Sequence, residues 1–252
     1  MNKYSPTHVQ AYYEASTDSY LRHYGDVIQA FRPTNTDSLL DYVGRSAGIN
    51  WKLSVLDLGC GVAGPAIHFA KRWNATVTGV TIAPKQFKIG NEKINQENVG
   101  NNVHLFLGDY HQLDNLPIEN DTYDVTLFLE SLGHSNNIHL ALENAYKKTA
   151  KNGRLYIKDF FKRKSANVIE QQQIDKVINN INKHYCYNTL DLDEAIEALE
   201  QTGWKNITVS TFDFMDDVSV RFNFEQENKI DIFENIPEFY PADWLEIKAV
   251  KS

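Results

Sequence analysis

From residue 53 onwards, short apolar runs alternate with longer amphipathic segments. Residues 53–58, 76–81 and 103–107 are apolar runs of strand length, and the segments that follow the first two, 63–73 and 84–98, have helical spacing. Strands that alternate with crossover helices form parallel sheets, so this pattern predicts an α/β fold. Four more strands are expected, at 125–129, 155–161, 207–214 and 244–250.

The remaining helical patterns lie before, between and after these strands. Ser5-Pro6 is a typical helix start, and Gly48, Gly153 and Gly203 are typical helix stops. Helices are therefore expected at 5–24, 37–43, 138–149, 162–188, 191–203 and 219–233.

The length of 252 residues is compatible with one domain. We expect an amino-terminal helical cap over 1–50, a ligand-binding core over 51–161, a lid-like insertion over 162–190 and the rest of the sheet over 191–252. The fold class is predicted to be α/β, with a Rossmann-like, seven-stranded, mostly parallel sheet and helices on both of its faces.

Composition limits the partners that we expect. The chain has 42% hydrophobic residues, 23% charged residues and a net charge of −8. Because phosphates are neutralised by clustered Lys and Arg, this balance argues against nucleic-acid partners. The densest basic run, Lys162-Arg163-Lys164, is interpreted either as a solvated loop or as a site for a diphosphate or carboxylate.

Cysteine content and hydropathy indicate the cellular location of the protein. Cys60 and Cys186 cannot form a disulfide framework, and no Cys/His cluster in the sequence predicts a metal site. No segment approaches the ~20 apolar residues of a membrane span. We therefore expect a cytoplasmic protein with no metal and no stable membrane insertion, and we leave its oligomeric state open, with a homodimer as one option.

A glycine-rich turn, Gly59-x-Gly61-x-x-Gly64, follows the first predicted strand. Its spacing matches the dinucleotide fingerprint, which usually has a carboxylate for the ribose about 20 residues further on. Thr81 occupies that position here, whereas Asp57 lies just before the turn. Glycine at 59 and 61 lets the backbone pass close to a ligand. The pattern favours a nucleoside with an amino-acid tail, whose amino group faces Asp57, over a nicotinamide dinucleotide.

These motifs resemble the class I S-adenosylmethionine (SAM)-dependent methyltransferases. Residues 56–61 are similar to motif I, and residues 79–86 are similar to a motif II variant of the cyclopropane-fatty-acid synthase, sterol, tocopherol and geranyl-diphosphate methyltransferase groups. The resemblance covers roughly residues 53 to 160 and departs at Ala83, where those groups often have Ser. It implies SAM as the cofactor, with binding residues Tyr12, Tyr20, Asp57, Gly59, Cys60, Gly61, Thr81, Ile82, Gln86, Asp109, Tyr110 and Glu130.

The acceptor is expected at the carboxyl ends of the fourth and fifth strands. Glu130 resembles the acidic residue that isoprenoid and sterol C-methyltransferases keep beside the reacting carbon, and His134 is a candidate base. Either residue can instead be structural, Glu130 by holding SAM or a loop amide and His134 by a hydrogen bond within its loop. The high content of aromatic residues favours an apolar or planar acceptor. Its candidate contacts are Tyr13, Phe160, Tyr185, Tyr187, Tyr240 and Trp244.

The sequence therefore predicts an enzyme that transfers a methyl group from SAM to a small molecule. A carbon atom of an isoprenoid-like or other specialised metabolite is one acceptor, and a nitrogen or oxygen atom is the alternative. A non-catalytic SAM-binding protein that acts through a partner and a nicotinamide-dependent oxidoreductase are the alternatives from other classes.

Overall fold

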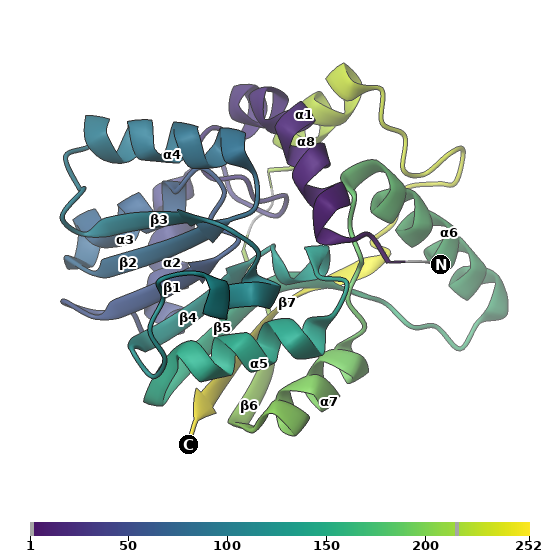
Figure 1. Ribbon diagram of the computed structural model, residues 1–252. Coiled ribbons are helices and arrows are strands. Elements are labelled where there is room, and N and C mark those ends of the chain that lie inside the picture. Colours follow the sequence, from purple (N-terminus) through teal and green to yellow (C-terminus); the bar gives the residue numbers. More distant parts are fainter. Residues whose placement is uncertain (1–2, 215–216) are drawn as a thin grey trace.

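The computed structural model describes residues 3–214 and 217–252, which form one central sheet surrounded by helices (Figure 1). The strands are β1 (Ser54–Leu58), β2 (Thr76–Thr81), β3 (Val103–Leu107), β4 (Tyr123–Leu129), β5 (Thr149–Lys162), β6 (Trp204–Thr211) and β7 (Ala242–Lys251). Within the described residues their order is β3-β2-β1-β4-β5-β7-β6, and β7 runs antiparallel to both of its neighbours. The predicted seven-stranded, mostly parallel sheet is confirmed.

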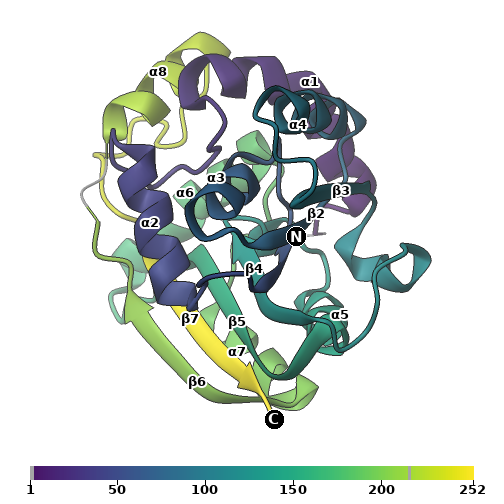
Figure 2. The same cartoon turned by 90° about the vertical axis from the view of Figure 1, so that its left-hand side faces the viewer.

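Helices cover both faces of this sheet, each over its own apolar core (Figure 2). α2 (Thr36–Ala47) and α3 (Gly64–Trp73) pack on the face that holds Val55, whereas α5 (Ile138–Lys148) and α7 (Leu192–Thr202) pack on the face that holds Leu56. Successive strand residues point to opposite faces, so Asp57 points to the same face as Val55.

A third group of helices lies beyond the carboxyl ends of the parallel strands. α1 (Pro6–Tyr24) crosses the start of α4 (Pro84–Gln96), and α8 (Val218–Asn228) packs beside α1, as both views show. The Glu14 carboxylate accepts a hydrogen bond from the Lys85 N–H at 2.7 Å, and Asp18 pairs with the Lys85 ammonium at 2.8 Å. Carboxylates are favourable beside a helix amino terminus, so these contacts fix α1 on α4. α6 (Val168–Tyr185) completes the group.

Several boundaries differ from the sequence prediction. The predicted helix over 138–149 ends at Lys148, because Thr149 already pairs with Tyr123 in the sheet, and Gly153 therefore lies inside β5. The last helix ends at Asn228 rather than at 233, because Lys229 has a φ of 55° and cannot continue it. β6 is Trp204–Thr211 rather than 207–214. Among residues 3–214 and 217–252, no helix is both long enough and apolar enough to cross a membrane.

Candidate active site

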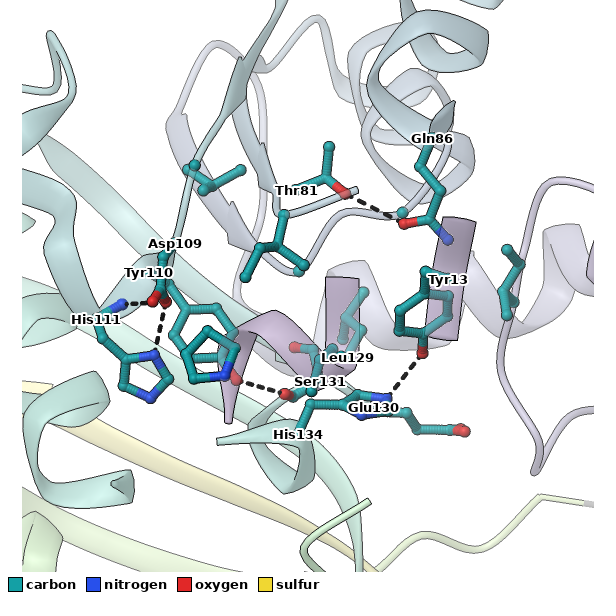
Figure 3. Close-up of a pocket in the computed structure, with 18 residues that line it drawn as sticks. Tyr13, Thr81, Gln86, Asp109, Tyr110, His111, Leu129, Glu130, Ser131 and His134 are labelled. Carbon is teal, nitrogen blue, oxygen red and sulfur yellow. Dashed lines mark hydrogen bonds and ion pairs between the residues drawn. The ribbon is translucent and has the colours of Figure 1, made fainter. Parts of the chain in front are cut away.

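A cleft opens at the carboxyl ends of β1, β2, β3 and β4. Figure 3 shows the residues that line it. Gly59 and Gly61 follow β1, Thr81 ends β2, and Tyr13 of α1 covers the opening. Open parallel sheets bind their ligands at this edge. The volume of the cleft is about 70 Å³.

The turn after β1 is shaped for close approach to the backbone. Gly59 has a φ of 92°, in the left-handed region that favours glycine, and a Cβ built there would lie 2.4 Å from the Ser131 Cβ. The Ser131 hydroxyl donates to the Leu58 carbonyl at 2.5 Å. The loop after β4 is thereby held against the turn, and a side chain at position 59 would separate them.

Asp57 carries a buried carboxylate just before this turn. It is 1% exposed, and within the described part of the chain neither of its carboxylate oxygens has a hydrogen-bond partner. Burial raises the pKa of Asp57 to about 7. An unpartnered buried carboxylate costs free energy, and a neighbouring ammonium group offsets that cost. The site therefore fits a ligand with an amino-acid end, as predicted for SAM.

The opposite side of the cleft holds the other residues predicted for a nucleoside. The Thr81 hydroxyl donates to the Gln86 Oε1 at 3.1 Å, and Ile82 lies between them in sequence and also lines the cleft. Asp109 Oδ1 accepts from the His111 N–H at 2.9 Å and lies 2.6 Å from His111 Nδ1. These contacts hold the Asp109 carboxylate at the cleft (Figure 3).

A larger cavity of about 820 Å³ adjoins the cleft between α1, α6, α8 and β7. We call it the acceptor cavity. All six residues that the sequence analysis assigned to acceptor contacts line it: Tyr13, Phe160, Tyr185, Tyr187, Tyr240 and Trp244. Its size and aromatic lining are typical of a small-molecule site.

The cleft and the acceptor cavity share Tyr13, Ile28, Glu130 and His134 in their linings. His134 Nδ1 lies 3.1 Å from the Cys186 carbonyl oxygen, which only accepts hydrogen bonds, so Nδ1 carries the proton. Nε2 is then an acceptor, and the Tyr13 hydroxyl donates to it at 2.7 Å (Figure 3). Burial lowers the pKa of His134 to about 4, so the imidazole is neutral at neutral pH.

Glu130 is held by more contacts than the sequence indicated. Its carboxylate forms an ion pair with the fully buried ammonium of Lys158 and accepts the Ala30 N–H at 2.6 Å. Lys158 also donates to Gln29 Oε1 and to the Phe31 carbonyl, both at 2.8 Å. Burial raises the pKa of Glu130, and Lys158 acts in the opposite direction. The pair therefore ties the segment before α2 to the sheet.

Asp159 and Tyr187 form a second buried contact at this edge. The Tyr187 hydroxyl donates to Asp159 Oδ1 at 2.6 Å, and the Gly133 N–H donates to Oδ2 at 3.1 Å. Burial raises the pKa of Asp159 to about 7. The Tyr187 ring packs directly on Gly133, where an added Cβ would lie 2.0 Å from it. Gly133 is therefore required for this wall of the acceptor cavity.

Four residues predicted to contact the cofactor do not line the cleft: Asp57, Tyr12, Tyr20 and Cys60. Asp57 is buried just before the glycine turn. Tyr12 donates or accepts a hydrogen bond with Tyr20 at 2.7 Å, and Tyr20 lines the acceptor cavity instead. The Cys60 side chain packs in the core on the α3 face. Conversely, His111, Ser131 and the cavity residues of α8 were not predicted. His111 and Ser131 directly follow predicted site residues, whereas the position of α8 depends on its packing on α1.

The basic run Lys162-Arg163-Lys164 lies outside both linings. Lys162 pairs with Asp175 at 2.7 Å, Arg163 with Glu170 at 3.4 Å and Lys164 with Asp193 at 2.6 Å. These three cations are used to attach the end of β5 to α6 and α7, so the interpretation as a diphosphate site receives no support from the structure.

Residues 55–153 match the methyltransferase domain family. Sterol 4-C-methyltransferase strm-1 from Caenorhabditis elegans is 27% identical over 125 residues, which is 50% of this chain and 36% of that protein. The chain spans between 36% and 61% of the length of the first curated relatives that it matches. The predicted resemblance to the methyltransferases is confirmed, and the family match covers residues 55–153.

Solved structures resemble the fold over nearly its whole length. The [4+2]-cyclase SpnF is 15% identical, with a TM-score of 0.74 over 100% of this chain and 97% of that one. Geranyl diphosphate C-methyltransferase from Streptomyces coelicolor A3(2), solved with S-adenosyl-L-homocysteine, is 15% identical, with a TM-score of 0.66 over 86% and 81%. These neighbours confirm the Rossmann-like methyltransferase fold.

Proposed function

We propose that the protein is a SAM-dependent methyltransferase that acts on a small molecule bound in the acceptor cavity. The observation that supports this most directly is the shared lining: Tyr13, Glu130 and His134 face both the nucleoside cleft and the acceptor cavity. When bound, SAM supplies an electrophilic methyl group on its sulfonium. The protein has to align donor and acceptor and exclude water, which can lower the barrier by several kcal/mol, on the order of 7.

The cleft residues, together with Asp57, which is buried just before the glycine turn and does not line the cleft, take the following roles in this proposal. Asp57 accepts from the amino group of the cofactor, and the Gly59 and Gly61 backbone lies against its amino-acid end. Thr81 and Gln86 are placed for the ribose, and Asp109 with Tyr110 for the adenine. Support comes from the unpartnered Asp57 carboxylate and from the lining of the cleft.

The Tyr13–His134 pair lies where the cleft meets the acceptor cavity. It favours methyl transfer to a nitrogen or oxygen atom over transfer to a carbon atom. The neutral imidazole presents an acceptor atom, Nε2, and Tyr13 presents a hydroxyl that can turn from Nε2 to the substrate. Such a pair orients a polar nucleophile and accepts its hydrogen bond. Glu130 is already occupied by Lys158 and Ala30, which suits a positioning role better than that of a base.

Calorimetry with S-adenosylhomocysteine and with NAD tests the cofactor. We expect S-adenosylhomocysteine alone to bind, and NAD binding in its place would overturn the proposal. Incubation with methyl-labelled SAM and an extract of the source organism tests catalysis, because a labelled small molecule should form. Cofactor binding without any labelled product would instead favour the non-catalytic alternative. The cytoplasmic location, the homodimer and the movement of the 162–190 segment stay predictions.

A further inference from the structure

The acceptor cavity is large and mostly apolar, and its solvent-exposed lining combines apolar with polar side chains. Phe222 and Val218 of α8 are 54% and 48% exposed, and Tyr240 before β7 is 60% exposed, yet all three line the cavity of about 820 Å³. Exposed apolar residues that border a cavity mark a binding surface for an apolar ligand. The space exceeds what a substrate the size of glycine or ethanolamine fills.

Aromatic faces surround the interior. Phe160 stacks on Tyr187 with ring centroids 4.7 Å apart and lies 5.0 Å from Trp244. On the other side, Tyr20 stacks on Phe224 at 4.4 Å, which places its ring along α8. Planar groups bind between such walls, and a cation over an aromatic face gains further attraction.

The charges of the lining are predominantly acidic. Among the described residues, Arg221 is the sole Lys or Arg in the lining, against the carboxylates of Glu225, Asp231 and Glu238, with Glu130 balanced by Lys158. The Tyr185 hydroxyl donates to Glu225 at 2.6 Å, which orients this carboxylate at the cavity. A diphosphate needs clustered cations, and the cations of the 162–164 run are paired with α6 and α7.

We infer that the acceptor is a bulky, planar or polycyclic amine that binds in its cationic form between the aromatic walls with its charge near Glu225, and that isoprenoid diphosphates are excluded. This inference rests on the proposed function, of which it names the substrate class. Methyl transfer takes place at a neutral nucleophile, so the atom that carries the charge and the atom that is methylated are different.

The test compares three probes by calorimetry at neutral pH: 9-aminoacridine, which is cationic, acridine, which has the same ring system but is neutral, and geranyl diphosphate. We expect 9-aminoacridine to bind about tenfold more tightly than acridine and geranyl diphosphate not to bind. Glu225→Gln keeps the acceptor for Tyr185 but removes the charge, so it should reduce the preference for the cation to about twofold or less.

Glu200→Gln is the matched control, because it removes the same charge from an exposed position on α7 outside the cavity. It should leave all three affinities unchanged. Three results would each overturn the inference. Geranyl diphosphate could bind as tightly as 9-aminoacridine, the two acridines could bind equally to the wild-type protein, or Glu225→Gln could keep the full preference for 9-aminoacridine over acridine. Titration with S-adenosylhomocysteine separates the two proposals: its failure to bind contradicts the methyltransferase function, whatever the probes do.

Discussion

The Tyr13 hydroxyl and His134 Nε2 lie 2.7 Å apart and join α1 to the loop after β4. Because His134 Nδ1 is fixed by the Cys186 carbonyl, this contact has one direction, from Tyr13 to His134. Both residues face the cleft and the acceptor cavity. The helix that covers the cofactor site is therefore attached at the point where the reaction is proposed to occur.

Tyr13→Phe should slow methyl transfer by about tenfold or more, because it removes the hydroxyl that orients the acceptor while keeping the ring. The affinity for S-adenosylhomocysteine should change by less than about threefold. Tyr12→Phe is the control, since its hydroxyl contacts Tyr20 and lines neither space. Rates measured with labelled SAM and calorimetry check both values. Equal rates in the two variants would rule out a role for the Tyr13 hydroxyl.

Asp57→Asn should abolish S-adenosylhomocysteine binding and flatten the pH dependence of stability. With a pKa of about 7 in the folded state and an ordinary value of 3.8, Asp57 holds its proton in the folded chain where the unfolded chain has lost it. The contribution of Asp57 to stability should thus fall as the pH rises between these values and level off above them. The variant lacks this titration, so above neutral pH it should melt at a higher temperature than the wild type.

The contribution of Asp159 to stability also falls as the pH rises, because its pKa is likewise raised to about 7. Thermal unfolding across this pH window should therefore show a reduced slope in Asp57→Asn rather than none. The same pH dependence of the melting temperature in Asp57→Asn and in the wild type would contradict the assignment of a buried, unpartnered carboxylate at position 57.

Glu130→Gln should destabilise the protein by about 3 kcal/mol, because it leaves the Lys158 ammonium buried beside a neutral amide. Adding Lys158→Met should restore most of this loss, since an apolar side chain of similar length replaces the unpaired charge. Urea unfolding of both variants gives the two free energies. If Glu130→Gln and the double variant lose the same free energy of unfolding, the unpaired Lys158 charge does not cause the destabilisation.

Gly133→Ala should destabilise by about 2 kcal/mol or more and weaken acceptor binding, because its Cβ displaces the Tyr187 ring. Gly100→Ala is the control: its nearest contact, Ile94, lies at 3.9 Å. Chemical denaturation and probe calorimetry compare the two variants. Equal free energies of unfolding in the two variants would mean that the Tyr187 ring moves to admit the Cβ without loss of stability.

Local motifs made the cofactor half of the site predictable. The strand that ends at Leu58, the turn at Gly59 and Gly61 and the helix after it are encoded by adjacent residues, so sequence spacing alone places them. The positions of Thr81 and Asp109 follow in the same way, because parallel strands end at one edge of the sheet.

Long-range packing hid the ion pair at Glu130 and the part of the acceptor cavity that α8 lines, although the six predicted acceptor contacts do line that cavity. Glu130 follows Leu129, which pairs with Lys158 in the register of β4 and β5, and only that register brings the two charges together. The part of the acceptor cavity lined by α8 depends on how that helix packs on α1, and α8 itself has no strong amphipathic pattern. Aromatic composition indicated the type of lining but not its charge.

The cofactor cleft draws most of its lining from one continuous stretch that begins at β1, whereas the acceptor cavity is assembled from α1, α6, α8 and the approach to β7. Substitutions in these peripheral elements can therefore alter which molecule is modified without touching the glycine turn. Tyr13, Ile28, Glu130 and His134 alone belong to both sets among the described residues. Substitutions that change the substrate should accordingly accumulate in the peripheral helices and spare these four shared residues.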